Sequence, residues 1–153
     1  SAALGTGEGG RLLTDSIRVS EVISAGTERI YNAWLSSQEH SAFTGGRAEI
    51  DPLVGGAFTA WDGYIQGRTL EMEPHRRIVQ SWRTTEFPDG SPDSRLDVLL
   101  EVVKGGTRIT LVHSDIPDGQ GRQYEEGWRE YYFKPMKAYF ESATSPGNSG
   151  RTS

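Results

Sequence analysis

Apolar and polar residues alternate along much of the chain, which is the pattern of strands in a sheet with one buried face. The first such stretch covers residues 17–24, where Ile17, Val19 and Ile23 alternate with polar side chains. Six further strand-like runs are separated by turn residues such as Gly105–Gly106. They cover residues 48–51, 57–61, 64–72, 78–84, 95–104 and 108–114. The short turns between them, with no crossover helices, predict an antiparallel meander.

Apolar residues take helical spacing at three other places in the chain. Two short helices are predicted over residues 27–35 and 37–43, the second ending at a Gly-Gly pair. A long helix is predicted over residues 123–142, and Pro135 inside it is expected to bend it. Its broad apolar stripe consists of Trp128, Tyr131, Tyr132, Pro135, Met136, Tyr139 and Phe140.

This order of elements predicts the class of fold. A sheet with one apolar face needs a large element to cover it, and the C-terminal helix is the largest available. We therefore predict an α+β domain over residues 15–141, with a curved antiparallel sheet of about six or seven strands wrapped around that helix. Residues 1–14 and 142–153 have small and polar residues without a period, and they are expected to be flexible tails.

Charge and composition exclude several classes of function. With 16 Lys and Arg against 21 Asp and Glu, the net charge is −5, so no nucleic-acid partner is expected. The absence of cysteine excludes disulfides, thiolate catalysis and zinc sites built on sulfur. The aliphatic run Val98–Leu99–Leu100 is far shorter than the roughly 20 residues of a membrane span. No signal peptide is recognised at the start, so the cytoplasm is the expected location.

Two motifs suggest chemistry that their context does not support. Residues 5–10 match a dinucleotide-binding glycine pattern, but no strand precedes them and no helix follows. His113, Ser114 and Asp115 are adjacent on a predicted strand, where neighbouring side chains point to opposite faces and cannot form a triad. We expect no cofactor and no metal site. His113 is predicted to be a hydrogen-bonded histidine on the inner face, or alternatively one that contacts a ligand.

Glu21 has the same parity as Ile17, Val19 and Ile23, which places a carboxylate on the apolar face of the first strand. A buried carboxylate needs a partner, for which His113 and Arg68 are the candidates. Alternatively, a bulge or the open mouth of the sheet exposes Glu21 to water. The sequence does not decide between these interpretations.

The aromatic residues form either a plain core or a core with a ligand cavity between sheet and helix. Cavities of this kind combine aromatic walls with a few polar groups. The predicted lining consists of Trp34, Phe43, Trp61, Trp82, His113, Trp128, Tyr132 and Met136. Glu21 and Arg68 are the candidate polar groups.

Five short motifs occur in order over almost the whole predicted domain. They are residues 54–58, 63–67, 73–74 with 77–79 and 82–83, 107–111, and 127–133. Together with the order of elements, they resemble the activator of heat-shock protein 90 ATPase homologue family of the START/polyketide-cyclase (SRPBCC) superfamily. The resemblance implies a helix-grip fold.

The expected function is the binding of a hydrophobic or aromatic small molecule in the cavity. The resemblance also implies two alternatives, which are a protein-interaction domain that contacts a heat-shock protein 90 and a cyclase or aromatase. No pair of residues in the sequence requires catalysis, so we do not predict an enzyme.

Overall fold

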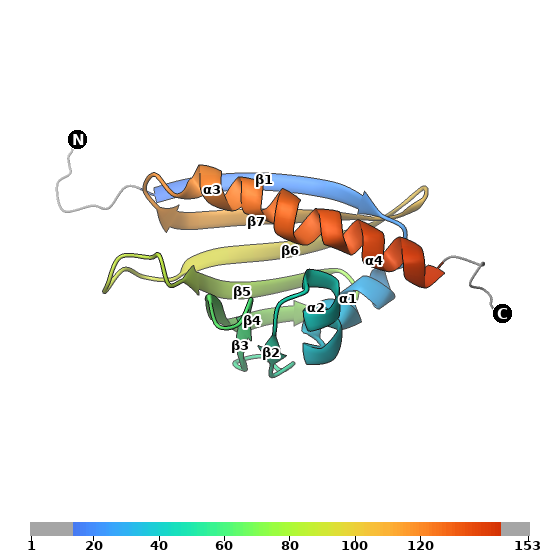
Figure 1. Ribbon diagram of the computed structural model, residues 1–153, viewed down its shortest axis with the longest axis horizontal. Coiled ribbons are helices and arrows are strands. Elements are labelled where there is room, and N and C mark those ends of the chain that lie inside the picture. The colour runs from blue at the N-terminus through green and yellow to red at the C-terminus, as the bar shows by residue number, and fades with distance from the viewer. Residues whose placement is uncertain (1–13, 145–153) are drawn as a thin grey trace.

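The computed structural model describes residues 14–144 (Figure 1). Its seven-stranded antiparallel sheet has the order β1-β7-β6-β5-β4-β3-β2. The strands are β1 (Thr14–Ile23), β2 (Glu49–Ile50), β3 (Ala57–Ala60), β4 (Ile65–Glu73), β5 (Arg77–Thr84), β6 (Ser94–Val103) and β7 (Gly106–Pro117). The helices are α1 (Thr27–Leu35), α2 (Ser37–Thr44), α3 (Gly121–Gly127), the π-helical η1 (Trp128–Phe133) and α4 (Lys134–Thr144).

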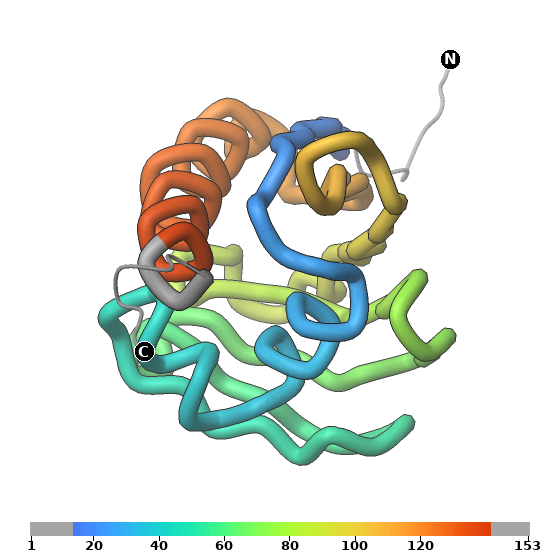
Figure 2. Tube along the Cα trace, turned by 90° about the vertical axis from the view of Figure 1, so that its right-hand side faces the viewer, coloured from blue at the N-terminus to red at the C-terminus, as the bar shows by residue number. Residues whose placement is uncertain are grey.

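The sheet curves around one side of the long C-terminal helix formed by α3, η1 and α4. Figure 2 shows this from one end of the molecule, with the helix in orange and red and the short helices α1 and α2 beside its C-terminal end. The α+β class, the seven antiparallel strands and the two short helices after the first strand are confirmed. Most of both predicted tails lies outside the described residues, although Thr14 begins β1 and α4 ends at Thr144.

Buried and exposed side chains alternate along the central strands, and the buried ones form the core. On β6, Leu96, Val98 and Leu100 are buried, while Arg95 and Glu101 are exposed. The buried side chains face the C-terminal helix because successive residues of a strand point to opposite faces. The single large core therefore lies between the sheet and that helix.

The C-terminal helix was predicted to bend at Pro135, and the structure shows a π-helical segment just before the proline, which the sequence did not predict. Residues Trp128–Phe133 form a π-helical segment, and the amide of Lys134 donates to the carbonyl of Arg129, five residues back. Pro135 follows directly, and it has no N–H to donate to the carbonyl of Tyr131. The α-helical hydrogen bond to that carbonyl is therefore missing in any case. The wider π-helical turn just before the proline costs no additional hydrogen bond at this position.

Candidate ligand-binding site

A cavity of about 430 Å³ lies between β4, β5 and the turn from β3 to β4 on one side and α3 and η1 on the other. Its volume falls within the range of about 300–1,000 Å³ that small-molecule sites occupy. Seven of its ten lining residues are aromatic: Trp61, Tyr64, Trp82, Tyr124, Trp128, Tyr131 and Tyr132. The others are Ile65, Gln123 and Gly127, so no lining residue carries a charge.

The inner wall of the cavity is a cluster of buried rings from the sheet and the helix. Trp82 on β5 lies 5.4 Å from Trp128 between ring centroids, and Trp128 lies 4.7 Å from Tyr132. Trp128 and Tyr132 are four residues apart, so they share one face of the helix. The sequence pattern that predicts an apolar stripe thus also builds the wall.

Trp61 and Tyr131 form the outer rim of the cavity. Their ring centroids lie 5.9 Å apart in an edge-to-face arrangement, and Tyr131 is 59% exposed. Trp61 has a left-handed backbone with φ of 52°, followed by Asp62 at 59° and Gly63 at 92°. Such values are rare for a bulky residue and indicate local strain. The turn between β3 and β4 therefore holds Trp61 at the rim with an unfavourable backbone conformation.

His113 lies behind the inner wall and is fully buried. The indole Nε1 of Trp128 donates to its Nδ1 at 3.1 Å, which leaves the ring proton on Nε2. That nitrogen donates to Ser94 Oγ at 2.8 Å, and Ser94 donates to the carbonyl of Trp82 at 2.6 Å. Burial lowers the pKa of His113 to about 3, so the imidazole is neutral. His113 is thus hydrogen-bonded on the inner face, which agrees with the first of the two interpretations of the sequence, and its bond to Trp128 fixes the orientation of that ring.

His40 on α2 holds the neighbouring ring in the same way, and the sequence analysis missed it. Its Nδ1 donates to the carbonyl of Trp34 at 2.9 Å, and its Nε2 accepts from the hydroxyl of Tyr132 at 2.8 Å. Burial lowers the pKa of His40 to about 4. The one available signal was the spacing of three residues between His40 and Phe43, which places both on one face of α2.

The structure places four of the predicted pocket residues in the cavity lining: Trp61, Trp82, Trp128 and Tyr132. Trp34 and Phe43 instead pack in the core behind Tyr132, at centroid distances of 5.4 Å and 6.2 Å. Met136 is fully buried one helical turn beyond Tyr132 and does not line the cavity.

Glu21 has neither of the partners expected for it. It pairs with Lys137 on α4 at 3.6 Å, and its side chain is 37% exposed. In the β1–β7 register Glu21 faces Ile109, whereas His113 faces Ile17, about 13 Å along the strand. The partly exposed carboxylate agrees with the alternative in which Glu21 meets water.

Arg68 also lies away from the cavity. Alternation along β4 places it with exposed Gln66 on the outer face of the sheet. Its guanidinium donates to the carbonyl of Gly55 at 2.9 Å. Neither Glu21 nor Arg68 lines the cavity, so the expectation that they orient a ligand there is not supported.

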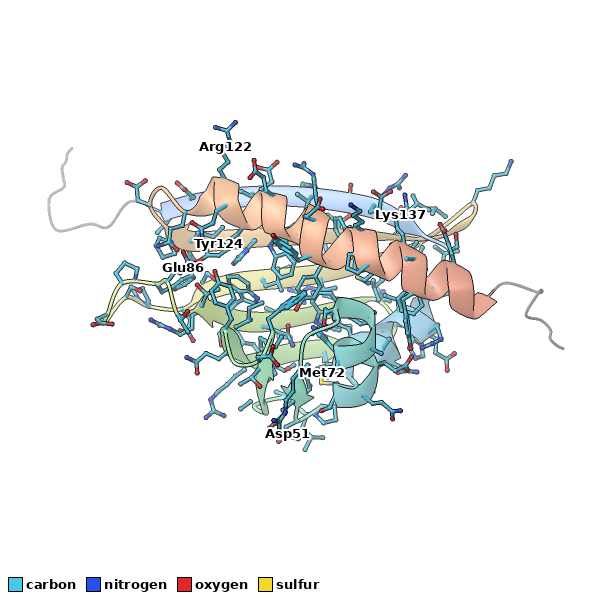
Figure 3. All side chains as sticks on the ribbon, in the orientation of Figure 1. Asp51, Met72, Glu86, Arg122, Tyr124 and Lys137 are labelled. Atoms are coloured by element: carbon cyan, nitrogen blue, oxygen red, sulfur yellow. The ribbon has the colours of Figure 1, made fainter. Side chains whose placement is uncertain are left out.

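The polar groups at the cavity instead come from residues that the sequence did not single out. The Glu86 carboxylate accepts hydrogen bonds from the hydroxyl of Tyr64 and, at 3.2 Å, from the amide of Gln123. These two bonds lower the pKa of Glu86. Tyr124 donates to Gln120 at 2.9 Å, and Figure 3 shows it close to Glu86 at one end of the helix.

Some absences follow for the part of the chain that the structure describes. Within residues 14–144, no group of three or more His, Asp or Glu side chains is placed to hold a metal ion. None of the helices in that range is long and apolar enough to cross a membrane. The cytoplasmic location stays a prediction.

A curved antiparallel sheet that grips a long C-terminal helix, with a cavity between the two, defines a helix-grip protein. The family described as "Activator of Hsp90 ATPase homolog 1-like protein" matches residues 24–141, and the chain belongs to this family. The family resemblance seen in the sequence is thereby confirmed.

Individual relatives agree with the family. The human activator of 90 kDa heat shock protein ATPase homolog 1 is 26% identical over 132 residues, which is 86% of this chain and 39% of the relative. Among solved structures, an HSP90 activator from Plasmodium falciparum superposes with a TM-score of 0.75 at 24% identity, covering 81% of this chain and 94% of that one. A protein from Chromobacterium violaceum gives 0.67 at 30% identity, covering 82% and 96%. The chain thus spans well under half the length of its human relative.

Proposed function

We propose that the protein binds hydrophobic small molecules with an aromatic or similarly compact body in the cavity between sheet and helix. The observation that carries this proposal is the cavity itself, which has about 430 Å³ of space and an uncharged, mostly aromatic lining. Apolar walls of this kind are the usual environment of a bound organic molecule. A lining without a charged acid or base offers no pair for acid–base catalysis, so we do not propose an enzyme.

The way the walls are held supports binding. Trp128 and Tyr132 are each fixed by a hydrogen bond to a buried, neutral histidine. Because these rings already have one orientation, a ligand that packs on them immobilises few additional rotamers. We expect dissociation constants on the order of micromolar, or about −8 kcal/mol.

An NMR titration with a panel of aromatic compounds tests the proposal, with Tyr131→Ala and Tyr139→Ala as a matched pair. Both variants remove a tyrosine ring from the C-terminal helix, but only Tyr131 lines the cavity. We expect binding to weaken several-fold in Tyr131→Ala and to stay unchanged in Tyr139→Ala. Shifts confined to surface amides far from the cavity, or equal effects of the two variants, would contradict small-molecule binding at this site.

A second candidate function is contact with a heat-shock protein 90, which the names of the relatives suggest. Leu53 and Val54 are each 63% exposed beside each other in the turn before β3, and such an apolar pair fits a protein contact. Calorimetric titration of a purified heat-shock protein 90 tests this. If the contact uses the pair, Leu53→Ser with Val54→Ser abolishes binding, whereas Val102→Ser, at another exposed valine, does not.

A further inference from the structure

The rings of the cavity present their planes in several directions. Trp82 and Trp128 are inclined by 45°, Trp128 and Tyr132 by 60°, and Trp61 and Tyr131 by 73°. The face of an aromatic ring carries a negative electrostatic potential, and it attracts a cation within about 6 Å of the centroid. A space bounded by differently inclined rings therefore presents several such faces to one occupant.

The charges near the cavity also favour a positively charged ligand. The Glu86 carboxylate lies at the rim, held by the lining residues Tyr64 and Gln123, and its lowered pKa keeps it ionised. In Figure 3 the side chain of Arg122 points upward from α3, away from Glu86, which lies beside Tyr124. The chain as a whole carries a net charge of −5.

Two arginines of the neighbouring elements are paired with carboxylates. Arg83 donates to Asp93 at 2.9 Å and lies over the ring of Phe87 at 5.4 Å from its centroid. Arg129 pairs with Glu125 at 3.0 Å on the helix surface. Their positive charges are thus partly compensated before a ligand arrives.

We propose that the preferred occupant is an organic cation, with a tertiary or quaternary ammonium group attached to an apolar body. The ammonium group would lie against the tryptophan and tyrosine faces near the rim, and the apolar body would fill the inner wall. This inference rests on the proposed function, since it names the chemical class of the ligand that the cavity binds.

Two isosteric probes separate charge from shape. In 3-hydroxyphenyltrimethylammonium a positively charged nitrogen replaces the central carbon of the tert-butyl group of 3-tert-butylphenol, and the two molecules otherwise match. Calorimetric titrations of the intact chain should show the cation binding about ten-fold more tightly, which corresponds to about 1.4 kcal/mol. The preference should decrease as salt is added, because the Glu86 carboxylate is exposed and therefore screened.

Two substitutions then locate the preference. Glu86→Gln keeps an acceptor for Tyr64 and removes the charge, and Tyr131→Leu keeps an apolar side chain and removes a ring face. Each substitution should weaken binding of the cation several-fold more than it weakens binding of 3-tert-butylphenol. Glu101→Gln is the control, because this exposed carboxylate pairs with Arg108 far along β6 from the cavity.

The outcomes distinguish the two proposals. Equal affinities for the two probes, or tighter binding of the neutral one, would overturn the cation inference and leave small-molecule binding intact. Binding of neither probe, together with no binding across the aromatic panel, would overturn both. A preference for the cation that Glu86→Gln and Glu101→Gln reduce equally would show a general effect of net charge and would also overturn the inference.

Discussion

Trp61 combines a strained backbone with a position at the rim of the cavity. Its φ of 52° costs free energy in the folded state, and residues held in this way cluster at binding sites. Gly46 makes room for the ring, since a Cβ at that position would lie 2.6 Å from Cε3 of the Trp61 indole. The surrounding structure is therefore shaped to keep this indole in place.

Replacing Trp61 with asparagine separates strain from function. Asparagine adopts the left-handed region more readily than tryptophan, so relief of strain offsets part of the lost packing. We expect the free energy of unfolding to change by less than about 1 kcal/mol in urea denaturation, which is no more than an average single substitution causes. Ligand binding should weaken about ten-fold. A large loss of stability with unchanged binding would show that Trp61 serves only the core.

The two buried histidines predict a dependence of stability on pH. Their pKa values are about 4 for His40 and about 3 for His113, below the usual value near 6.5 of an unfolded chain. Below pH 6.5 the unfolded state therefore binds more protons, and the free energy of unfolding falls as the pH falls. Between pH 6 and pH 5 the loss should be about 2 kcal/mol for both histidines together.

Urea denaturation at pH 7, 6 and 5 measures this loss, with His40→Gln as the comparison. The variant lacks one of the two histidines that take up a proton on unfolding. The change in its free energy of unfolding between pH 6 and pH 5 should therefore be about half that of the original chain. Equal stability of the original chain at pH 6 and pH 5 would show that both imidazoles accept protons in the folded state.

At the scale of elements, the π-helical segment η1 joins α3 to α4, and these two helices contact different parts of the fold. It contains three residues of the cavity lining, Trp128, Tyr131 and Tyr132. An extra residue in a helix is accommodated by such a segment, and these segments are common at functional sites. We infer that η1 sets the positions of the rings at the cavity, while Tyr124 in α3 before it and Phe140 in α4 after it both stay buried.

Deletion of Glu130 tests this role of η1. The residue is exposed and pairs with Lys134 on the helix surface, so its loss should allow an ordinary α-helix through the segment. We expect a folded protein with unchanged circular dichroism and a loss of ligand binding of at least ten-fold, because Tyr131 and Tyr132 are displaced. A deletion variant that binds normally would show that the π-helical geometry is unimportant for the site.

The sequence predicted the elements better than their local geometry. Alternation on β7 placed His113 on the inner face, because that argument depends only on the two-residue period of a strand. The π-helical segment was missed because a four-residue spacing of Trp128, Tyr132 and Met136 fits an α-helix and a wider turn equally well. The candidate partners of Glu21, His113 and Arg68, do not contact it, because parity gives the face of a strand but not the position along it. The left-handed Trp61 has no signal in a residue type that rarely adopts this conformation.

At the scale of the whole molecule, the first and the last elements of the described range both contribute to the core. β1 contributes the buried side chains of Val19 and Ile23 and pairs with β7 along its length, and α4 contributes Met136 and Phe140. The first element, β1, is thus the strand at one edge of the sheet, and the last element, α4, covers part of its inner face. The fold depends on both ends of the range 14–144.

A pair of truncations tests this dependence. The fragment 14–144 should keep a free energy of unfolding within about 1 kcal/mol of the full chain, a difference typical of a single substitution. The fragment 24–141, which covers the range matched by the family, lacks β1 and should not fold cooperatively. A folded 24–141 fragment, or a clearly weakened 14–144 fragment, would contradict this account of the core.

The hydrogen bonds from Trp128 to His113 and from Tyr132 to His40 also bear on the cavity when it is empty. An indole or phenol ring without a hydrogen bond can rotate into a neighbouring empty space and fill it. It then loses only its former packing contacts. Here rotation of either ring leaves a buried imidazole nitrogen without its donor, which costs about 1–3 kcal/mol. The cavity therefore stays open without an occupant. Association should then follow single-step kinetics, with a rate proportional to ligand concentration and limited by passage between Trp61 and Tyr131 rather than by rearrangement of the wall.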